Sequence, residues 1–421
     1  MGRRYFGTDG VRGVVGGDLT EGLVARIGVG FARWSGGAPV LVGRDTRASG
    51  PALERALARG LAAGGSEVSL GGVLPTPAVA LLAPDGGAVV SASHNPAEYN
   101  GVKLFRGGWK LGDSEEEAIE ELMDEPSGGG GPPQETRGLA GQYVELVCER
   151  FGADLGGLRI AVDCANGAMT DIAPTAFRRL GADLVVVGDA PDGSNINAGC
   201  GATDLTLLAR TVAAEDVDLG VAFDGDGDRM LAVDAAGNEV DGDQILAVLA
   251  LHLGVDLVAV TQMTNLGFHR LMSEHGIRVV VTDVGDRYVL EALRREGGVL
   301  GGEQSGHVVY LRDHVTGDGL AAALLLCGAV ADRGETLAAL AGAMPRFPQA
   351  KANVPVRAMA VPPGLLAEVE RMEDELDGAG RVLVRPSGTE PVVRVLAEAE
   401  TPEAAERLCA RIVPLVRREL G

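Results

Sequence analysis

The sequence is poor in lysine and strongly acidic, which limits what the protein can bind. Lysine occurs only at positions 103, 110 and 351, so arginine carries nearly all of the positive charge. With 59 acidic and 37 basic residues, the formal net charge is -22. Nucleic acids and anionic membranes would repel such a chain. We therefore expect neither as a partner, and any phosphate site must be a local, enclosed cluster of arginines.

The sequence also lacks paired cysteines and long apolar runs. Its five cysteines are scattered, with no C-x-x-C pair and no short Cys/His spacing, which is typical of small buried residues in a reducing compartment. The start, MGRRYFGTDG, has no signal-peptide core. The longest apolar stretch, about residues 320–331, is shorter than the roughly 20 residues that cross a bilayer. We expect a cytoplasmic protein without membrane spans.

The order of apolar, glycine-rich and proline-rich segments predicts several α/β domains. A chain of 421 residues exceeds what one core usually supports. Glycines and prolines at 126–138 end a first unit, because they cannot hold a helix or a central strand. Strand-like runs alternate with helix-like segments before this linker, then from 158 to 223 and from 256 to 310. A smaller unit begins near 350. Such alternation indicates layered α/β domains.

The segment DGDGDR, Asp224 to Arg229, follows the apolar run LGVAF and predicts a metal site. Carboxylates at alternating positions of a glycine-rich loop can converge on one hard cation, and α/β proteins tend to bind ligands at the carboxyl ends of strands. An EF-hand is disfavoured, because Arg229 and Ala235 stand where that loop needs glycine and glutamate. A solvated acidic turn is the alternative.

The segment SASHNP supplies a candidate nucleophile, Ser93, at the end of another predicted strand. We expect Asn95 and Pro96 to force a turn that exposes the serine hydroxyl. No G-x-S-x-G elbow surrounds the serine, so acyl transfer is poorly supported. Nearby, Lys103 could neutralise an oxyanion or shuttle a proton. The alternatives are a turn-forming serine and a surface lysine.

Two further motifs point to sugar and phosphate binding. In GEQSGH, the Glu303 carboxylate can accept hydrogen bonds from two adjacent sugar hydroxyls. The segment RPSGTEPVVR, residues 385–394, combines two arginines with hydroxyls and backbone N–H groups that suit an anion. The alternative is that the same residues form an ordinary strand–turn–strand. Neither a Walker A loop nor a dinucleotide fingerprint can be built. A serine, a metal cage, a sugar clamp and an anion cradle together indicate phosphoryl transfer.

With these motifs in this order, the chain resembles the α-D-phosphohexomutase superfamily over essentially its whole length. The resemblance implies an α/β protein of four domains around a central cleft. The first three share a mixed α/β three-layer topology, and the fourth is a smaller α+β domain. We place the phosphoserine domain at 1–137, the metal-binding domain at 138–239, the sugar-binding domain at 240–348 and the phosphate-binding domain at 349–421.

The same resemblance assigns roles to individual residues. It implies a phosphoserine at Ser93 and one magnesium ion per chain, held by that residue and the three aspartates, Asp224, Asp226 and Asp228. Sugar hydroxyls would be held by Glu303 and Ser305. The non-reacting phosphate would be bound by residues of the last motif: Arg385, Ser387, Gly388, Thr389 and Arg394. Polar residues around the reacting centre would be Arg12, Lys103, Arg229 and His307. Lys103 and His307 are the candidates for general acid/base work.

Further segments resemble one branch of the superfamily, the phosphoglucosamine mutases. These segments are RYFGTDGVRG, VDCANGA, VDGDQI, VGDRYV, GGEQSGH and HVTGDGL. The branch interconverts glucosamine 6-phosphate and glucosamine 1-phosphate through a bisphosphate, with a hexose 1,6-bisphosphate as primer, and supplies amino-sugar precursors of UDP-N-acetylglucosamine and the cell wall. Ala202 and Asp204 depart from the serine and histidine usual in this branch.

Other functions remain open at this point. The hexose branches, phosphomannomutase and phosphoglucomutase, more often carry a histidine where Asp286 stands. A metal-dependent sugar phosphatase would share the serine and the aspartates but would not need both a sugar clamp and a distant phosphate loop. A noncatalytic sensor would be expected to have lost one of these residues. The partners expected are small sugar phosphates, and a homodimer is one option for the assembly.

Overall fold

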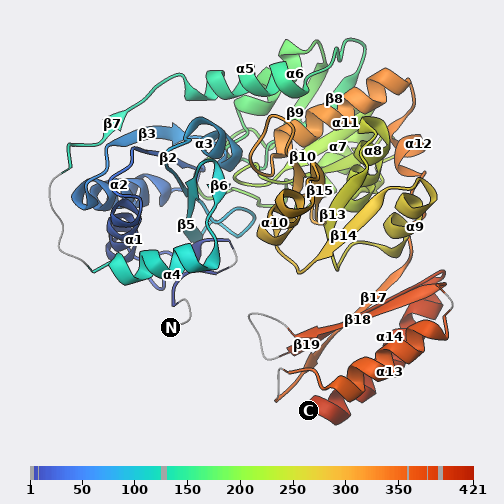
Figure 1. Cartoon of the computed structure of the whole chain (residues 1–421). Helices are drawn as coiled ribbons and strands as arrows, with labels where there is room; N and C mark the ends of the chain where they lie inside the picture. The colour runs from blue at the N-terminus through green and yellow to red at the C-terminus, as the bar shows by residue number, and fades with distance from the viewer. Residues whose placement is uncertain (1–3, 8, 125–129, 358–359, 377, 387–391) are drawn as a thin grey trace. The chain divides into compact units, whose positions relative to one another are not determined.

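The structure, a computed structural model, divides the chain into two compact units (Figure 1). It describes residues 4–7, 9–124, 130–357, 360–376, 378–386 and 392–421. The first unit comprises Met1–Thr261 and Val279–Gly342, and the second comprises Gln262–Arg278 and Ala343–Gly421. The candidate serine, the three aspartates and Glu303 all belong to the first unit.

A mixed seven-stranded sheet begins the first unit, in the order β1-β5-β4-β2-β3-β7 with β6 beside β5. The central strands pair in parallel, whereas β5 runs antiparallel to both β4 and β1. The two-residue strand β7 lies at the edge, within the predicted linker, where a short pairing is tolerated. The strands are β1 (Val11–Val14), β2 (Val40–Arg44), β3 (Val68–Val73), β4 (Gly87–Val90), β5 (Tyr99–Arg106), β6 (Trp109–Lys110) and β7 (Gln134–Glu135).

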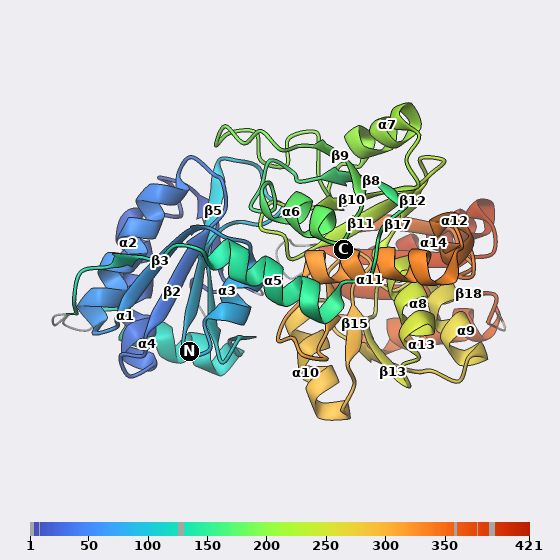
Figure 2. The ribbon, with the colours of Figure 1, turned by 90° about the horizontal axis from the view of Figure 1, so that it is seen from above.

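Helices cover both faces of this sheet (Figure 2). On one face α1 and α2 pack closely together, α4 packs on α1, and their apolar side chains form one core with β2, β4 and β5. On the other face lies α3, and α5 extends from it toward α6 and α11. The helices are α1 (Glu21–Trp34), α2 (Gly50–Gly64), α3 (Thr76–Leu82), α4 (Asp113–Leu122) and α5 (Leu139–Phe151).

Two smaller mixed sheets complete the first unit. The five-stranded sheet has the order β12-β11-β10-β8-β9, and the four-stranded sheet has the order β14-β13-β15-β16. The strands are β8 (Arg159–Asp163), β9 (Asp183–Val187), β10 (Leu219–Phe223), β11 (Met230–Asp234), β12 (Glu239–Val240), β13 (Leu257–Thr261), β14 (Arg278–Thr282), β15 (Leu300–Gly302) and β16 (Val308–Tyr310). The helices are α6 (Ile172–Arg179), α7 (Thr206–Glu215), α8 (Gly242–Leu253), α10 (Asp286–Glu296), α11 (Gly319–Arg333) and α12 (Leu337–Ala341).

The second unit is a small antiparallel sheet packed against helices (Figure 1). Its strand order is β17-β19-β18, and apolar residues of the sheet share a core with α13 and α14. The elements are α9 (Leu266–Glu274), β17 (Gln349–Pro355), α13 (Pro363–Asp374), β18 (Gly380–Pro386), β19 (Val392–Ala399) and α14 (Pro402–Leu420). The helix–sheet composition predicted for the end of the chain is confirmed. In the sequence, the amphipathic helix α13 precedes the β18–β19 hairpin and the amphipathic helix α14 follows it.

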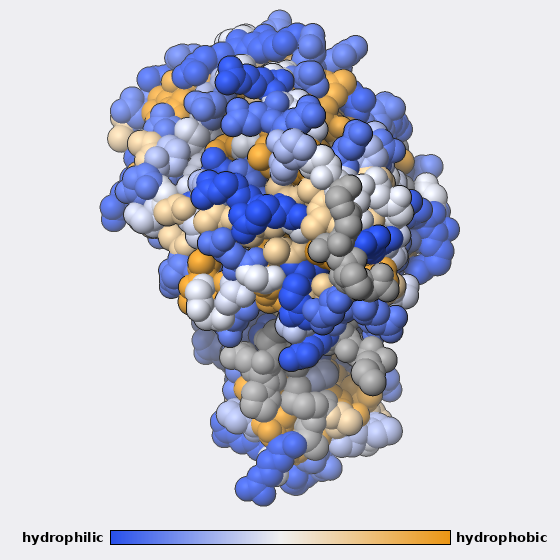
Figure 3. Space-filling view, turned by 90° about the vertical axis from the view of Figure 1, so that its left-hand side faces the viewer, coloured by the Kyte–Doolittle hydropathy of each residue, from blue (hydrophilic) through white to orange (hydrophobic). Residues whose placement is uncertain are grey.

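On the face shown in Figure 3, hydrophilic side chains predominate among the coloured residues and hydrophobic ones form small separate patches. Among the described residues, no helix combines the length and apolarity that a membrane crossing requires. The apolar stretch near residue 320 is the buried helix α11.

Gly60 sets how closely α1 and α2 approach. A Cβ atom there would lie 1.9 Å from the Ala25 carbonyl oxygen, whereas one at Gly22, in the first turn of α1, would meet only Thr20 Oγ1 at 3.8 Å. We predict that Gly60→Ala lowers the free energy of unfolding by about 1–3 kcal/mol, because the helices must separate. Urea denaturation of Gly60→Ala and the control Gly22→Ala checks this. Equal stability of the two variants would contradict it.

Candidate active site

Ser93 lies in the loop between β4 and β5, at the carboxyl end of β4. It is 1% exposed, so the predicted exposure of its hydroxyl is wrong. The loop that begins after β10 packs over it, and Ser93 Oγ donates a hydrogen bond to Asp224 Oδ2 at 2.5 Å. Its backbone has a positive φ of 52°, a conformation that residues other than glycine seldom adopt. The serine is therefore held, buried, against the predicted metal loop.

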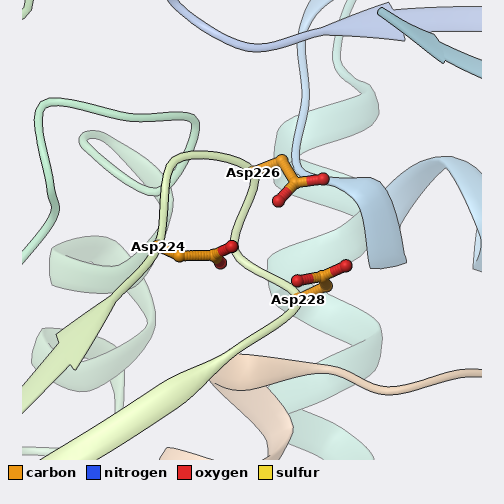
Figure 4. A group of neighbouring side chains, drawn as sticks. All are labelled: Asp224, Asp226 and Asp228. Carbon is orange, nitrogen blue, oxygen red and sulfur yellow. The ribbon is translucent and has the colours of Figure 1, made fainter. Parts of the chain in front are cut away.

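Asp224, Asp226 and Asp228 gather on that loop, between β10 and β11 (Figure 4). One oxygen from each carboxylate lies within 4.8 Å of the others, and all three residues are buried. Asp226 Oδ1 and Asp228 Oδ1 are buried without a hydrogen-bond partner among the described residues. Unpartnered carboxylate oxygens are costly to bury and are good ligands for a hard divalent cation. The donor set therefore fits a cation, and the position at a strand end is as predicted.

The electrostatics of Asp224 favour cation binding. Burial raises the pKa of Asp224 well above its usual range, and the neighbouring charges of Asp228 and Asp226 raise that pKa further. A cation bound among the three carboxylates would oppose this shift by favouring their ionised forms.

Lys103 lies in the same charge cluster rather than on the surface. It projects from β5, is 2% exposed, and its Nζ lies 2.9 Å from Asp226 Oδ2 and 2.8 Å from Asp228 Oδ2. Burial lowers the pKa of Lys103, but the carboxylates of Asp226, Asp228 and Asp9 outweigh burial and hold that pKa well above its usual range. The surface alternative is therefore wrong, and the ammonium is a fixed positive charge.

Three residues that the sequence analysis gave no role extend this cluster into an alternating chain of charges. Asp9 Oδ2 lies 3.1 Å from Lys103 Nζ, and Asp9 Oδ1 lies 2.7 Å from Lys110 Nζ. Lys110 also forms an ion pair with Asp286. Asp9 could have been found from the sequence, because it lies in the FGTDGVRG segment close to the predicted Arg12. Lys110 could not, because it lies in β6 and no sequence pattern connects it with Asp286.

His307 ends the charge chain. Its Nε2 lies 3.3 Å from Asp286 Oδ2 and its Nδ1 lies 3.8 Å from Asp228 Oδ1. Burial lowers the pKa of His307, but Asp286 and Asp228 outweigh burial and raise it. A Cβ atom at Gly317 would lie 2.1 Å from His307 Nε2, so only glycine fits against the imidazole. This contact gives the HVTGDGL segment a structural role.

A cavity of about 200 Å³ opens beside these groups. Glu303 lines it, with Oε1 accepting from the Gly285 backbone N–H at 3.0 Å and Oε2 accepting weakly from Ser305 Oγ at 3.4 Å. Ser305 itself is exposed. The cavity is also lined by charged and imidazole side chains: Asp9, Arg12, His94, Lys110, Asp228, Arg229, Asp286 and His307. Its charged, hydrogen-bonding lining suits a small, charged, hydroxylated molecule.

The predicted arginines Arg12 and Arg229 lie on this cavity and increase its positive charge. Arg12 pairs with Asp9 and donates to Asn95 Oδ1 at 3.0 Å. Next to the candidate serine, burial, together with the positive charges of Arg229 and Arg12, lowers the pKa of His94 to about 4. His94 is therefore neutral at pH 7, and its Nδ1 lies 3.3 Å from Ser93 Oγ.

The predicted phosphate motif belongs to the second unit. Arg385 on β18 and Arg394 on β19 are register partners across the hairpin. Ser387, Gly388 and Thr389 lie outside the described residues. The anion cradle formed by these five residues stays a prediction, as do the exact domain boundaries at 137, 239 and 348.

Comparisons with known proteins identify the family. The chain matches the phosphoglucomutase/phosphomannomutase domain families: alpha/beta/alpha domain I over residues 3–128, domain II over 138–237, domain III over 241–347, and the C-terminal domain over 330–415. Phosphoglucosamine mutase of Pelotomaculum thermopropionicum is 48% identical, with 98% of each chain covered. The chain belongs to the phosphoglucomutase/phosphomannomutase family. The predicted four-domain α/β fold is thereby confirmed.

Two further comparisons agree. Phosphoglucosamine mutase of Bacillus subtilis is 44% identical, with 99% of each chain covered. The crystal structure of a phosphoglucomutase/phosphomannomutase family protein from Burkholderia thailandensis is 27% identical and superimposes with a TM-score of 0.85, covering 98% of each chain. The departures at Ala202 and Asp204 lie in the loop before α7 and are not among the residues that line the cavity. Ala202 N donates to the carbonyl oxygen of Phe223, the residue before Asp224, at 2.8 Å, and Asp204 accepts a hydrogen bond from Thr206 N at 3.1 Å.

Divalent-cation binding by this phosphohexomutase family member tests the carboxylate cluster. We predict that Asp226→Asn weakens affinity for Mg²⁺ or Mn²⁺ by about tenfold or more, because it removes one charged oxygen ligand. Asp183→Asn, which neutralises an exposed carboxylate on β9, is the matched control. Isothermal titration calorimetry measures both. Unchanged affinity in Asp226→Asn would mean that the three aspartates form only an acidic turn.

Proposed function

We propose that the protein is a phosphoglucosamine mutase that interconverts glucosamine 6-phosphate and glucosamine 1-phosphate. The observation that carries the proposal is the hydrogen bond of 2.5 Å between Ser93 Oγ and Asp224 Oδ2, which joins a candidate phosphate carrier to a buried carboxylate cluster. The names of the relatives that align over nearly the whole chain support the amino-sugar substrate.

The proposed reaction uses Ser93 as the phosphate carrier. The phosphoryl group leaves Ser93 Oγ as its phosphorus bonds to the free hydroxyl oxygen of the sugar monophosphate. That hydroxyl gives up its proton, and Ser93 Oγ takes up a proton to become a hydroxyl. The resulting bisphosphate reverses its orientation and returns its other phosphoryl group to Ser93. Because the phosphoserine is regenerated, each cycle conserves it, and a hexose 1,6-bisphosphate is needed only to prime the enzyme.

Asp224, Asp226 and Asp228, together with the Ser93 phosphate, are the residues proposed to hold one Mg²⁺. When bound, a divalent cation neutralises charge on the phosphoryl group and polarises it for transfer. A phosphoserine carries about -1.5 to -2 charge near neutral pH. Lys103, which stays protonated among the carboxylates, and the guanidinium of Arg229 on the cavity supply positive charge from the protein itself.

We assign proton transfer to His307. Lys103 is held charged by three carboxylates, so it is a poor base, whereas the imidazole of His307 lies on the cavity and has a pKa raised from 6.5. An imidazole on the cavity can both accept the hydroxyl proton and return it. Lys103 then acts electrostatically, by stabilising charge on the transferring phosphoryl oxygens.

Substrate binding is assigned to two regions of the chain. Glu303 and Ser305 are proposed to bind sugar hydroxyls, since Glu303 lines the cavity with its carboxylate held by the Gly285 N–H. The non-reacting phosphate is assigned to the RPSGTEPVVR segment in the second unit. One such cradle can serve both orientations of the bisphosphate.

The substrate assay described below can also reveal two other activities. A phosphomannomutase or phosphoglucomutase would use the same serine and metal site with another sugar, and a metal-dependent phosphatase would release phosphate to water. The proposal also includes a cytoplasmic location and small sugar phosphates as partners, with a homodimer to be tested by light scattering.

The sugar preference decides among these activities. Glu303 cannot distinguish an amine from a hydroxyl at position 2, so the preference rests on the relatives. We predict that glucosamine 6-phosphate is converted with higher kcat/KM than mannose or glucose phosphates, in assays primed with glucose 1,6-bisphosphate. Ser93→Ala should remove turnover and exclude a contaminating enzyme. A preference for a hexose phosphate by about tenfold, near 1.4 kcal/mol in transition-state binding, would move the protein to the hexose branch.

A further inference from the structure

Arg47 is a fully buried arginine that the proposed reaction does not use. It follows β2, before α2 begins, and its side chain is 0% exposed. The pocket that would receive the substrate does not include it among its lining residues. Burying a guanidinium this completely is costly unless each of its donors finds a partner. The contacts of Arg47 therefore indicate what the burial achieves.

All five side-chain N–H donors of Arg47 have acceptors, and four of these acceptors lie in the loop between β4 and β5 or at its end, on the first residue of β5. The loop is the segment that carries the candidate nucleophile. Nη2 donates to the carbonyl oxygens of Ser93 at 2.9 Å and Asn95 at 2.7 Å. Nη1 donates to the carbonyl oxygens of Tyr99 at 2.9 Å and Pro96. The fifth donor, Nε, lies 2.8 Å from Asp45 Oδ2.

The amide side of Ser93 is held by the same buried array. Ser93 N donates to Ser91 Oγ at 2.9 Å, and Ser91 Oγ donates to Asp45 Oδ2 at 2.6 Å. Because Asp45 Oδ2 also accepts from Arg47 Nε, the bonds close into a ring that includes both the N–H and the C=O of Ser93. We call Asp45, Arg47 and Ser91 the serine clamp.

The clamp acts on a residue with an unfavourable backbone conformation. Ser93 has a φ of 52°, in the left-handed region that residues with a Cβ atom avoid. Such conformations persist only where the surroundings determine them, and they concentrate at functional sites. In this conformation Ser93 Oγ points to Asp224 Oδ2. The clamp therefore fixes the direction of the hydroxyl that is proposed to carry phosphate.

We infer that Arg47 is a positioning residue for phosphoryl transfer, acting through the backbone of Ser93, and not a ligand of any phosphate. Its donors are already committed to carbonyl oxygens and to Asp45, so none is left to bind a phosphoryl oxygen. The inference rests on the proposed function, because it presupposes that Ser93 carries the phosphoryl group. It adds a requirement for arginine that no motif indicated.

Lysine cannot replace arginine in this role. A lysine ammonium has three donors around one nitrogen, whereas the planar guanidinium presents five donors in a fixed fork. Arg47→Lys keeps the buried charge but must release several of the four carbonyls. The Ser93 carbonyl keeps its hydrogen bond from Asn197 Nδ2 at 3.0 Å but loses the fork of the guanidinium. Ser93 can then shift, and small displacements of a reacting group cost about 10²-fold in rate.

The test compares Arg47→Lys with Arg59→Lys, the same change at an exposed arginine of α2 whose weak pairing with Glu21 lies on the surface. Phosphoenzyme prepared with glucose 1,6-bisphosphate is mixed with glucosamine 6-phosphate, and single-turnover transfer, kcat and KM are measured below the melting temperature of each variant. We expect transfer and kcat in Arg47→Lys to fall by about 10²-fold, with KM within about twofold of wild type. Arg59→Lys should match wild type.

Ser91→Ala provides a second variant if Arg47→Lys folds poorly. It removes only the hydroxyl that links Ser93 N to Asp45, and we expect kcat to fall by about tenfold with KM unchanged. Wild-type kcat in folded Arg47→Lys or in Ser91→Ala would overturn the inference and leave the proposed function intact. A raised KM with unchanged kcat in Arg47→Lys would also overturn it, because that result marks a substrate ligand. Absence of mutase turnover in wild type would overturn both.

Discussion

Three carboxylates buried within a few ångströms of one another repel each other, and the contacts between the sheets of the first unit compensate for this repulsion. The loop after β10 brings Asp224, Asp226 and Asp228 together out of contact with water. From the protein, Lys103 supplies the nearest countercharge to Asp226 and Asp228, and it reaches them from another sheet. An arrangement of this kind is stable only while both sheets stay together, since either set of charges left alone in the interior would be strongly unfavourable.

The same electrostatic requirement joins the sheets into one reaction centre. From Lys103 the charges alternate through Asp9, Lys110 and Asp286, and they end at the imidazole of His307. These residues come from segments far apart in the sequence, which the fold brings together, and all of them except Lys103 line the cavity. The network keeps Lys103 charged, whereas the imidazole of His307 faces the cavity. The proposed division of labour between an electrostatic and a proton-transferring residue rests on these surroundings and not on the residue types alone.

Local sequence patterns predicted the elements well and the burial of the site poorly. The apolar run expected to lead into DGDGDR is the strand β10, which ends at Phe223, and the smaller unit expected from near residue 350 has its first strand at Gln349–Pro355. Apolar periodicity and strand-end loops are local properties, so one sequence can reveal them. The exposure expected for Ser93 was wrong, because the loop that covers it comes from more than a hundred residues away. The same limit hid Arg47, whose acceptors are mostly backbone carbonyls that no motif records.

The central claim is that Ser93 carries the phosphoryl group, and the most direct measurement is mass spectrometry of the protein itself. The purified chain is incubated with glucose 1,6-bisphosphate and Mg²⁺, its intact mass is determined, and its peptides are mapped. The account predicts one phosphoryl group per chain, located on Ser93, which is lost on addition of excess glucosamine 6-phosphate. A phosphoryl group on another residue, or none at all in a preparation that turns over substrate, would contradict it.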